Sequence, residues 1–163
     1  MPIPRELALS TEELDELMMT SKTIRLATMG PGERINLTPL WFSWAGGCVY
    51  TFCRGQKVEN IRRNSQATAV VDRNELFVEL QGAMLQGRAI VLEDEAAERS
   101  DPHLEEARLR HASKYSRSSG PGESAPRNAA TARGRNSRWV VLQPDRIVSW
   151  DNTKLEAFRR SRS

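Results

Sequence analysis

Short segments of alternating or β-branched residues, each followed by a turn signal, dominate the sequence and restrict the folds open to it. The first, residues 23–28, alternates apolar and other side chains and ends at the turn signal Gly30-Pro31-Gly32. By the same criteria, further strands are predicted over residues 35–44, 48–52, 67–72, 76–81, 84–92, 139–142 and 147–150. A run of antiparallel strands with short connections exposes two edges unless the sheet closes on itself. The pattern therefore predicts a mainly β fold, a β-barrel with peripheral helices.

Three segments have helical rather than strand periodicity. Ser10 followed by Glu13 is a capping-box pattern, which predicts a short amphipathic helix over residues 10–20. Val58 and Ile61 share one side of a second predicted helix, residues 57–64. A third is expected over residues 101–115, where proline stands near the first turn.

A length of 163 residues is that of one domain, and a domain of this size can bury a core without needing disulfide bonds. We therefore expect a single domain over residues 1–163, with an N-terminal arm at 1–9 and a basic tail at 156–163. Residues 116–137 contain no aliphatic side chain larger than alanine, so they are predicted to form a mobile loop.

The net charge of +3 is unevenly distributed. Residues 1–126 hold 15 basic and 18 acidic side chains, whereas residues 127–163 hold 9 and 3. The basic end lacks interleaved aromatic residues and any known nucleic-acid motif, which favours a solvated tail, or one packed near an anionic cofactor, over a nucleic-acid site. The apolar runs are too short to cross a bilayer, so we expect a cytoplasmic protein without a membrane partner.

The cysteines and histidines fit no metal or catalytic set. Cys48 and Cys53 lie five residues apart in an apolar stretch, which favours buried free thiols over a disulfide or a zinc site. His103 and His111 lack nearby partners for a metal, so surface or packing roles are expected. No serine elbow or P-loop is present, and no side chain is predicted to be catalytic.

The most informative segment is the predicted junction of a strand with the second helix. Four cations fall within ten residues there: Arg54, Lys57, Arg62 and Arg63. A helix start presents unpaired N–H groups with partial positive charge, to which Arg54, Gln56 and Lys57 add donors. This arrangement suits a phosphate, although spacing alone fits a solvated basic helix start equally well.

Aromatic residues near two predicted strands offer a surface for a flat ring. Pro39 withholds one ladder donor from a strand that ends in Trp41 and Trp44. Trp150 and Lys154 place another aromatic ring and a cation at the last strand. Any of Trp41, Trp44, Trp139 and Trp150 could instead be a core residue, which is the more common role of a single tryptophan.

Taken together, four stretches of the chain resemble the pyridoxamine 5'-phosphate oxidase-like split-barrel superfamily, most closely its class B of flavin/deazaflavin-dependent oxidoreductases, many of which use coenzyme F420. The resemblance spans roughly residues 10–155. The stretches are Ile24-Arg25-Leu26-Ala27-Thr28, Leu37-Thr38-Pro39-Leu40-Trp41-Phe42, Gln56-Lys57-Val58-Glu59-Asn60-Ile61-Arg62-Arg63 and Ser149-Trp150-Asp151-Asn152-Thr153-Lys154.

The resemblance implies a homodimeric, FMN-binding-like split β-barrel with F420 or FMN at the subunit interface. In the family, positions matching Gln56 and Lys57 approach the cofactor phosphate, with Arg54 as a weaker candidate. Related enzymes often carry arginine where Gly55 stands here. Trp150 and Lys154 look like the residues that a partner subunit contributes near the ring. The residues that match the strand lying along the ring are Asn36, Thr38, Pro39, Leu40 and Trp41.

The function implied is hydride transfer between the bound cofactor and a small organic substrate, with the protein supplying orientation and electrostatics. The branch resemblance and the arginine-rich composition favour F420 over FMN. One alternative is a pyridoxamine 5'-phosphate oxidase, for whose substrate phosphate no separate set of residues is found. Another is a non-catalytic flavin or haem binder. Loss of His103 or His111 would change the spectrum of a haem protein only.

Overall fold

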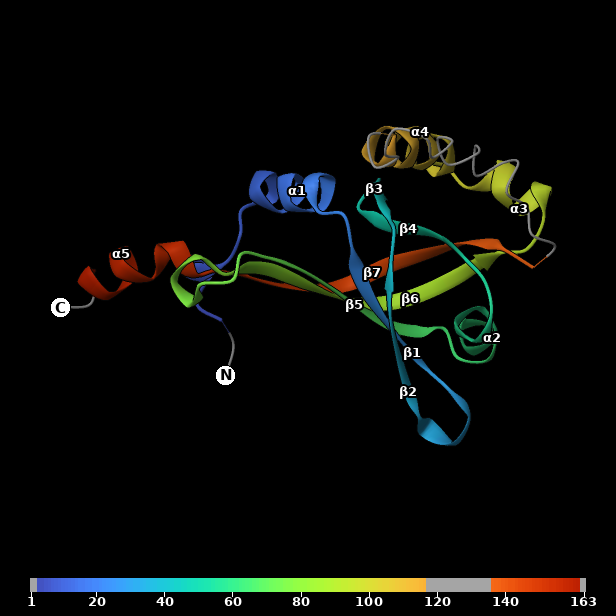
Figure 1. Ribbon diagram of the computed structural model, residues 1–163, viewed down its shortest axis with the longest axis horizontal. Coiled ribbons are helices and arrows are strands. Elements are labelled where there is room, and N and C mark those ends of the chain that lie inside the picture. The colour runs from blue at the N-terminus through green and yellow to red at the C-terminus, as the bar shows by residue number, and fades with distance from the viewer. Residues whose placement is uncertain (1–2, 117–135, 162–163) are drawn as a thin grey trace, which may run out of the picture.

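The structure is a computed structural model that describes residues 3–116 and 136–161. Figure 1 shows a strongly twisted antiparallel sheet with α1 and α4 on one side and α2 on the other. The strands, all antiparallel, follow the order β2-β1-β5-β6-β7-β4-β3 across the sheet. Their bounds are β1 (Ile24–Met29), β2 (Ile35–Leu40), β3 (Ser43–Ala45), β4 (Cys48–Cys53), β5 (Gln66–Arg73), β6 (Gln81–Leu92) and β7 (Arg138–Asp151).

The two edge strands, β2 and β3, are neighbours in the sequence. Only Trp41 and Phe42 separate them. The edges of a flat sheet of seven strands would lie about 29 Å apart, whereas the chain from Leu40 to Ser43 spans at most about 11 Å. The sheet therefore curls until its edges approach, which gives a barrel that stays split between β2 and β3. The predicted mainly β barrel fold is confirmed, with the barrel left open between β2 and β3.

The strand predicted over residues 35–44 is wrong as one element, because it forms two strands with different partners. β2 pairs with β1, and β3 pairs with β4. Between them, the N–H of buried Phe42 donates to the hydroxyl of Tyr115 (2.9 Å) rather than to a strand. The alternation of side chains in a sequence shows that a segment is extended, but it does not show which strand the segment pairs with. The change of pairing partner within residues 35–44 could therefore not be predicted.

The strand predicted over residues 76–81 is wrong as well. The chain reverses at Asn74, whose φ is +71°, and the Asn74 amide donates to the carbonyl of Glu79 (2.7 Å). The 3₁₀ turn η3 (Phe77–Glu79) follows, and its apolar side chains are exposed. Apolar composition alone had favoured a strand here.

Residues 139–142 and 147–150, predicted as two strands, belong to the single strand β7. Pro144 is accommodated by a register shift between Gln86 and Gly87 of β6. A Cβ atom on Gly87 would come within 2.1 Å of the carbonyl oxygen of Gln143, so the close approach of the strands at this bulge requires glycine.

The helices cover the sheet at its faces and ends. The predicted capping box is present, since Ser10 Oγ accepts from the Glu13 N–H (3.2 Å) and the Glu13 carboxylate accepts from the Ser10 N–H (2.7 Å). The helix predicted over residues 101–115 begins later, and a separate helix of six residues precedes it. The helices are α1 (Thr11–Thr20), α2 (Gln56–Arg63), α3 (Glu95–Ser100), α4 (Leu104–Tyr115) and α5 (Leu155–Arg160), with 3₁₀ turns at Arg5–Leu7 (η1), Pro31–Glu33 (η2), Phe77–Glu79 (η3) and Asn152–Lys154 (η4).

Most of the loop predicted over residues 116–137 lies outside the described residues. The expected basic tail contains α5 in its described part. Within the described ranges, no helix is long and apolar enough to cross a membrane.

Two apolar clusters hold the fold together. The larger fills the barrel and the undersides of α1 and α2, and includes Leu17, Leu85 and Leu142. The smaller lies between α4 and the outer face of β4 and β7, where Leu104 packs with Trp139.

The smaller cluster gives a matched test on one helix. Leu104 is 1% exposed and Leu109 is 66% exposed. We expect Leu104→Ala to lower the free energy of unfolding by about 2–5 kcal/mol through lost burial and a residual cavity. Leu109→Ala should change it by less than about 0.5 kcal/mol. Urea unfolding of both variants measures the difference, and equal effects would contradict the packing of α4 on this face.

Candidate functional site

The start of helix α2 is an open, donor-rich turn. β4 ends at Cys53, and Gly55 then turns the chain into the helix with a φ of +79°, a conformation that glycine adopts without steric cost. A Cβ atom on Gly55 would meet nothing within 4 Å. The first helical N–H groups, those of Gln56 and Lys57, have no acceptor within the helix. Unpaired donors therefore lie beside open space.

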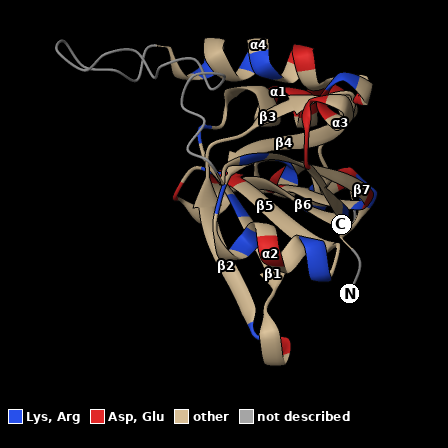
Figure 2. Cartoon of the chain, turned by 90° about the vertical axis from the view of Figure 1, so that its right-hand side faces the viewer, with Lys and Arg blue, Asp and Glu red and all other residues tan. Residues whose placement is uncertain are grey.

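Two cations at this turn have no acidic partner. The ammonium of half-buried Lys57 donates to the carbonyl of Arg54 (2.9 Å), and the side chain of Arg54 is exposed. Among the described residues, no carboxylate forms an ion pair with either. Figure 2 shows basic positions on both sides of an acidic one along α2. The turn thus carries positive charge that no carboxylate in the described part of the chain neutralises.

The other end of α2 differs, because its cations are committed to the protein. Arg62 pairs with Glu59 and with Glu93, each at 2.5 Å. Arg63 donates to the carbonyl of Met29 (2.8 Å). Of the four cations predicted for this segment, the structure leaves Arg54 and Lys57 available to an anion.

Gln56 is held by a buried asparagine that sequence reasoning missed. Its amide nitrogen donates to Asn60 Oδ1 (2.9 Å), and Asn60 Nδ2 donates to Thr28 Oγ1 (3.0 Å). Asn60 is fully buried. The available signal was a polar residue between Val58 and Ile61, the apolar residues of this helix face.

Strand β2 lies close to this turn through its neighbour β1. Thr28 of β1 pairs with Asn36 of β2, and α2 packs on β1. The side chains of Asn36, Thr38 and Leu40 are half-buried on one face of β2, and that of Pro39 is exposed on the other. Within one chain, the structure therefore places α2, whose start is the predicted phosphate-binding turn, near β2, the strand predicted to lie along the cofactor ring.

Trp150 and Lys154 lie elsewhere. They belong to the end of the sheet that carries η3 and α5, opposite α2 (Figure 1). Trp150 lies over Gly82, where an added Cβ would come within 2.3 Å of the indole ring. Lys154 donates to Glu13 (2.5 Å) and to the carbonyl of Ala8 (2.9 Å), and this ammonium lowers the pKa of the Glu13 carboxyl. Within one chain, neither residue joins the α2 site.

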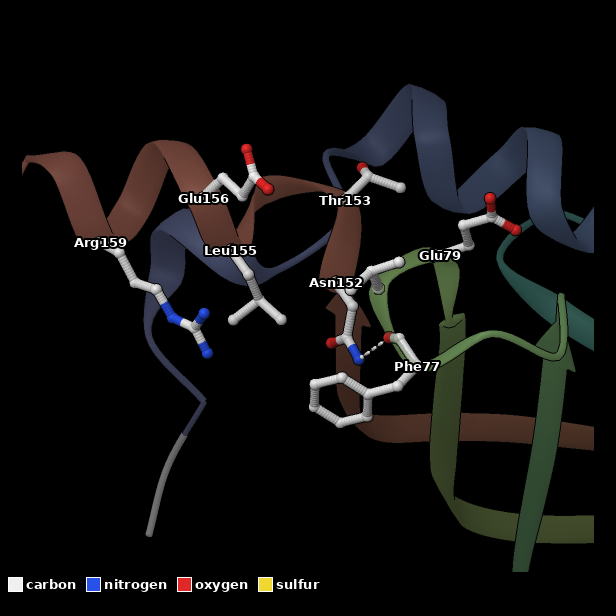
Figure 3. A pocket seen from close by; sticks show the side chains of 8 residues that line it. Phe77, Glu79, Asn152, Thr153, Leu155, Glu156 and Arg159 are labelled. Carbon is white, nitrogen blue, oxygen red and sulfur yellow. Dashed lines mark hydrogen bonds between the residues drawn. The ribbon is translucent and has the colours of Figure 1, made fainter.

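A shallow hollow of about 380 Å³ lies at that same end of the sheet (Figure 3). The side chains of Phe77 and Val78 line one side and that of Leu155 another, while Asn152 Nδ2 donates to the carbonyl of Phe77 (2.6 Å). β5 connects α2 to η3 over eight residues, a span of about 26 Å. The hollow is thus separate from the α2 turn.

Trp41, just beyond β2, is part of an aromatic cluster. Its ring stacks on that of Tyr115 with centroids 4.4 Å apart and an interplanar angle of 6°. His111 lies 4.6 Å from Tyr115 and 5.8 Å from Trp139. With 49% of its surface exposed, Trp41 keeps an accessible side. Tyr115, which anchors this cluster, had no signal in the sequence beyond its place near the end of a helix.

The histidines and cysteines have the simple roles expected. His111 packs among aromatic rings, and His103 is partly exposed beside Glu106. Cys53 is buried and Cys48 half-buried, both as free thiols. No group of three metal-ligating side chains occurs in the parts of the chain that the structure describes.

No family model matches the sequence, and no curated protein matches it. Solved structures match over most of the chain. A conserved hypothetical protein from Mycobacterium tuberculosis gives a TM-score of 0.77 at 22% identity, over 96% of this chain and 93% of that one. An FAD-binding protein from Mesorhizobium loti gives 0.62 at 20% identity, over 87% and 94%. The haem storage protein HutZ from Vibrio cholerae gives 0.64 at 14% identity, over 85% and 94%.

These similarities define the fold as the split β-barrel of pyridoxamine 5'-phosphate oxidase-like proteins, as the sequence predicted. A putative pyridoxamine 5'-phosphate oxidase from Listeria innocua shares it, with a TM-score of 0.57 at 16% identity over 85% of this chain and 95% of that one. The ligands named for these structures differ, so the chemistry of this chain has to be argued from its own residues.

The environment of His111 yields a pH prediction. Burial lowers the pKa of His111 to about 4 from its ordinary value of 6.5. As the pH falls below 6.5, the unfolded chain takes up this proton before the folded chain does, so the free energy of unfolding decreases down to about pH 4. We expect His111→Phe to lose less stability than wild type between about pH 7 and pH 5, measured by urea unfolding. An NMR titration midpoint of 6.5 for His111 would contradict this.

Proposed function

We propose that the protein binds a phosphorylated flavin-type cofactor, F420 or FMN, and serves as an oxidoreductase that transfers a hydride between this cofactor and a small organic substrate. The observation that carries the proposal is the turn at α2, where Arg54 and Lys57 have no acidic partner among residues 3–116 and 136–161 and the first helical N–H groups have no acceptor within the helix. Such a donor set fits a phosphate.

Strand β2 supports the placement of the ring. β2 is an edge strand, so one side of its backbone has no ladder partner. It lies directly beside β1, the strand on which α2 packs. Its residues Asn36, Thr38 and Leu40 share the half-buried face. Trp41 adds an exposed aromatic surface at the strand's end.

The residues present fit a division of labour in which the bound cofactor supplies the hydride chemistry. Arg54, Gln56 and Lys57 bind and orient the phosphate end. The edge of β2 offers backbone donors and acceptors to the ring. Burial lowers the pKa of His111 to about 4, so the His111 imidazole carries no charge at neutral pH.

We further propose that the active form is a homodimer. Leu76, Phe77 and Val78 are exposed apolar residues at the same end of the sheet as Trp150. Ile35 and Leu37 are exposed on the outer face of β2. In a two-fold dimer, residues 76–78 of each chain would pack on the outer face of the partner's β2, so the same contact occurs twice. It would also bring Trp150 near the partner's β2, the strand along which the ring is proposed to lie.

A parallel fluorescence or calorimetric titration with F420, FMN and haem tests the cofactor. We expect saturable binding of F420 or FMN, with a preference for F420, followed by turnover with unsaturated organic substrates. Binding of haem alone, or of none of the three, would overturn the proposal. Tight flavin binding without turnover would support the non-catalytic alternative.

The same titration measures the contribution of Lys57. We expect Lys57→Ala to weaken binding of the phosphorylated cofactor by about 1–3 kcal/mol, because a charge-assisted hydrogen bond is lost. Arg62→Ala is the matched control on the same helix, since Arg62 is already paired with Glu59 and Glu93. Equal losses in the two variants would remove Lys57 from the site.

Sedimentation or light scattering tests the dimer. We expect wild type to have the mass of two chains and Phe77→Glu that of one, because a charge in an apolar interface carries a desolvation cost. Leu109→Glu, which alters an equally exposed residue on α4, should remain dimeric. A monomeric wild type would contradict the proposal.

A further inference from the structure

We infer that Asn60 is a positioning residue for cofactor binding: it orients Gln56 at the start of α2 and fixes the spacing between this turn and strand β2. This inference rests on the proposed function. It starts from an unusual placement, because Asn60 has no exposed surface and yet carries a fully polar side chain. A buried amide is stable only when its donors and acceptors are satisfied.

The orientation of the Asn60 amide is fixed by its neighbours. Arg63 has donors only, and its Nη2 lies 3.1 Å from Asn60 Oδ1. The oxygen must therefore face Arg63, and the nitrogen is directed to Thr28 Oγ1. Arg63 is itself held by the carbonyl of Met29 (2.8 Å). Both contacts tie Asn60 to the end of β1.

This orientation determines how Gln56 lies. Since Asn60 Oδ1 is an acceptor, Gln56 must present its amide nitrogen to it, at 2.9 Å. That bond uses one of the two N–H donors of Gln56. The second N–H remains for a ligand at the open turn beside Gly55. Asn60 thus selects which end of the Gln56 amide is held and restricts its rotamers before a ligand binds.

The same asparagine sets a distance across the site. Thr28, its hydrogen-bond acceptor, pairs directly with Asn36 of β2. The path from the α2 turn to the predicted ring strand therefore consists of side-chain hydrogen bonds and one strand pairing. A cofactor that spans both elements needs this separation to be constant, because preorganisation lowers the ordering cost of binding.

Two pairs of probes report on the phosphate: FMN with riboflavin, which differ by the phosphate alone, and F420 with its deazariboflavin fragment, which lacks the phosphate and the tail attached to it. For each protein variant, the ratio of the two dissociation constants in a pair measures the gain in affinity that the phosphate brings, here called the phosphate gain. We expect Gln56→Ala and Asn60→Ala each to reduce this gain by about ten- to hundredfold, the range for one hydrogen bond to a charged group. The affinity for the phosphate-free probe should change little, which also shows that the variants are folded.

A double-mutant cycle distinguishes positioning from general support of the fold. If Asn60 acts through Gln56, the double variant Gln56→Ala/Asn60→Ala should lose no more than either single variant. Multiplied losses would overturn the orienting role, because they would mean that Asn60 acts independently of Gln56.

Thr28 supplies a second test with a milder change. Thr28→Val removes the hydroxyl that accepts from Asn60, and should reduce the phosphate gain, whereas Thr28→Ser keeps the hydroxyl and should preserve it. Equal behaviour of the two variants would overturn the inference. A wild type that shows no phosphate gain with either pair of probes overturns the proposed function as well. A gain that survives Asn60→Ala overturns the positioning role alone.

Discussion

The two-residue link between β2 and β3 governs the shape of this protein. Because Trp41 and Phe42 are all that separate the two edges of the sheet, the seven strands have to curl into a barrel. The link has no strand partner, and Tyr115 forms a hydrogen bond with its backbone instead. The Tyr115 hydroxyl accepts from the N–H of Phe42 (2.9 Å) and lies 2.9 Å from the carbonyl of Lys22. Burial raises the pKa of Tyr115 to about 12, so this hydroxyl keeps its proton.

Curling also explains how distant parts of the chain form one site. β1 lies between β2 and β5, and α2 follows β4, yet α2 packs on β1 through Asn60. The donor-rich start of α2 is therefore positioned by the covalent connection to β4, by the polar contact of Asn60 with β1 and by the burial of Val58 and Ile61.

Local chemistry made some of these features predictable from the sequence. The capping box before α1 and the cation-rich start of α2 depend on residues a few positions apart, and both are found as expected. The division of residues 35–44 into two strands depends on Tyr115, more than seventy residues away, and no local pattern reports such a contact. The exposed turn at Phe77 was mistaken for a strand because apolar composition does not reveal whether a surface is covered. Asn60 was missed because its burial depends on packing against β1, where Thr28 accepts its hydrogen bond.

The split between β2 and β3 has a mechanical consequence. Every other neighbouring pair in the sheet is joined by a ladder, whereas these two edges are joined only by the chain itself. The distance between the two edges is therefore set at one end, by the link that Tyr115 holds, and no ladder hydrogen bond fixes it along the rest of the seam. The barrel thus has one boundary whose separation depends on a short covalent link and a buried hydroxyl rather than on a row of backbone pairs.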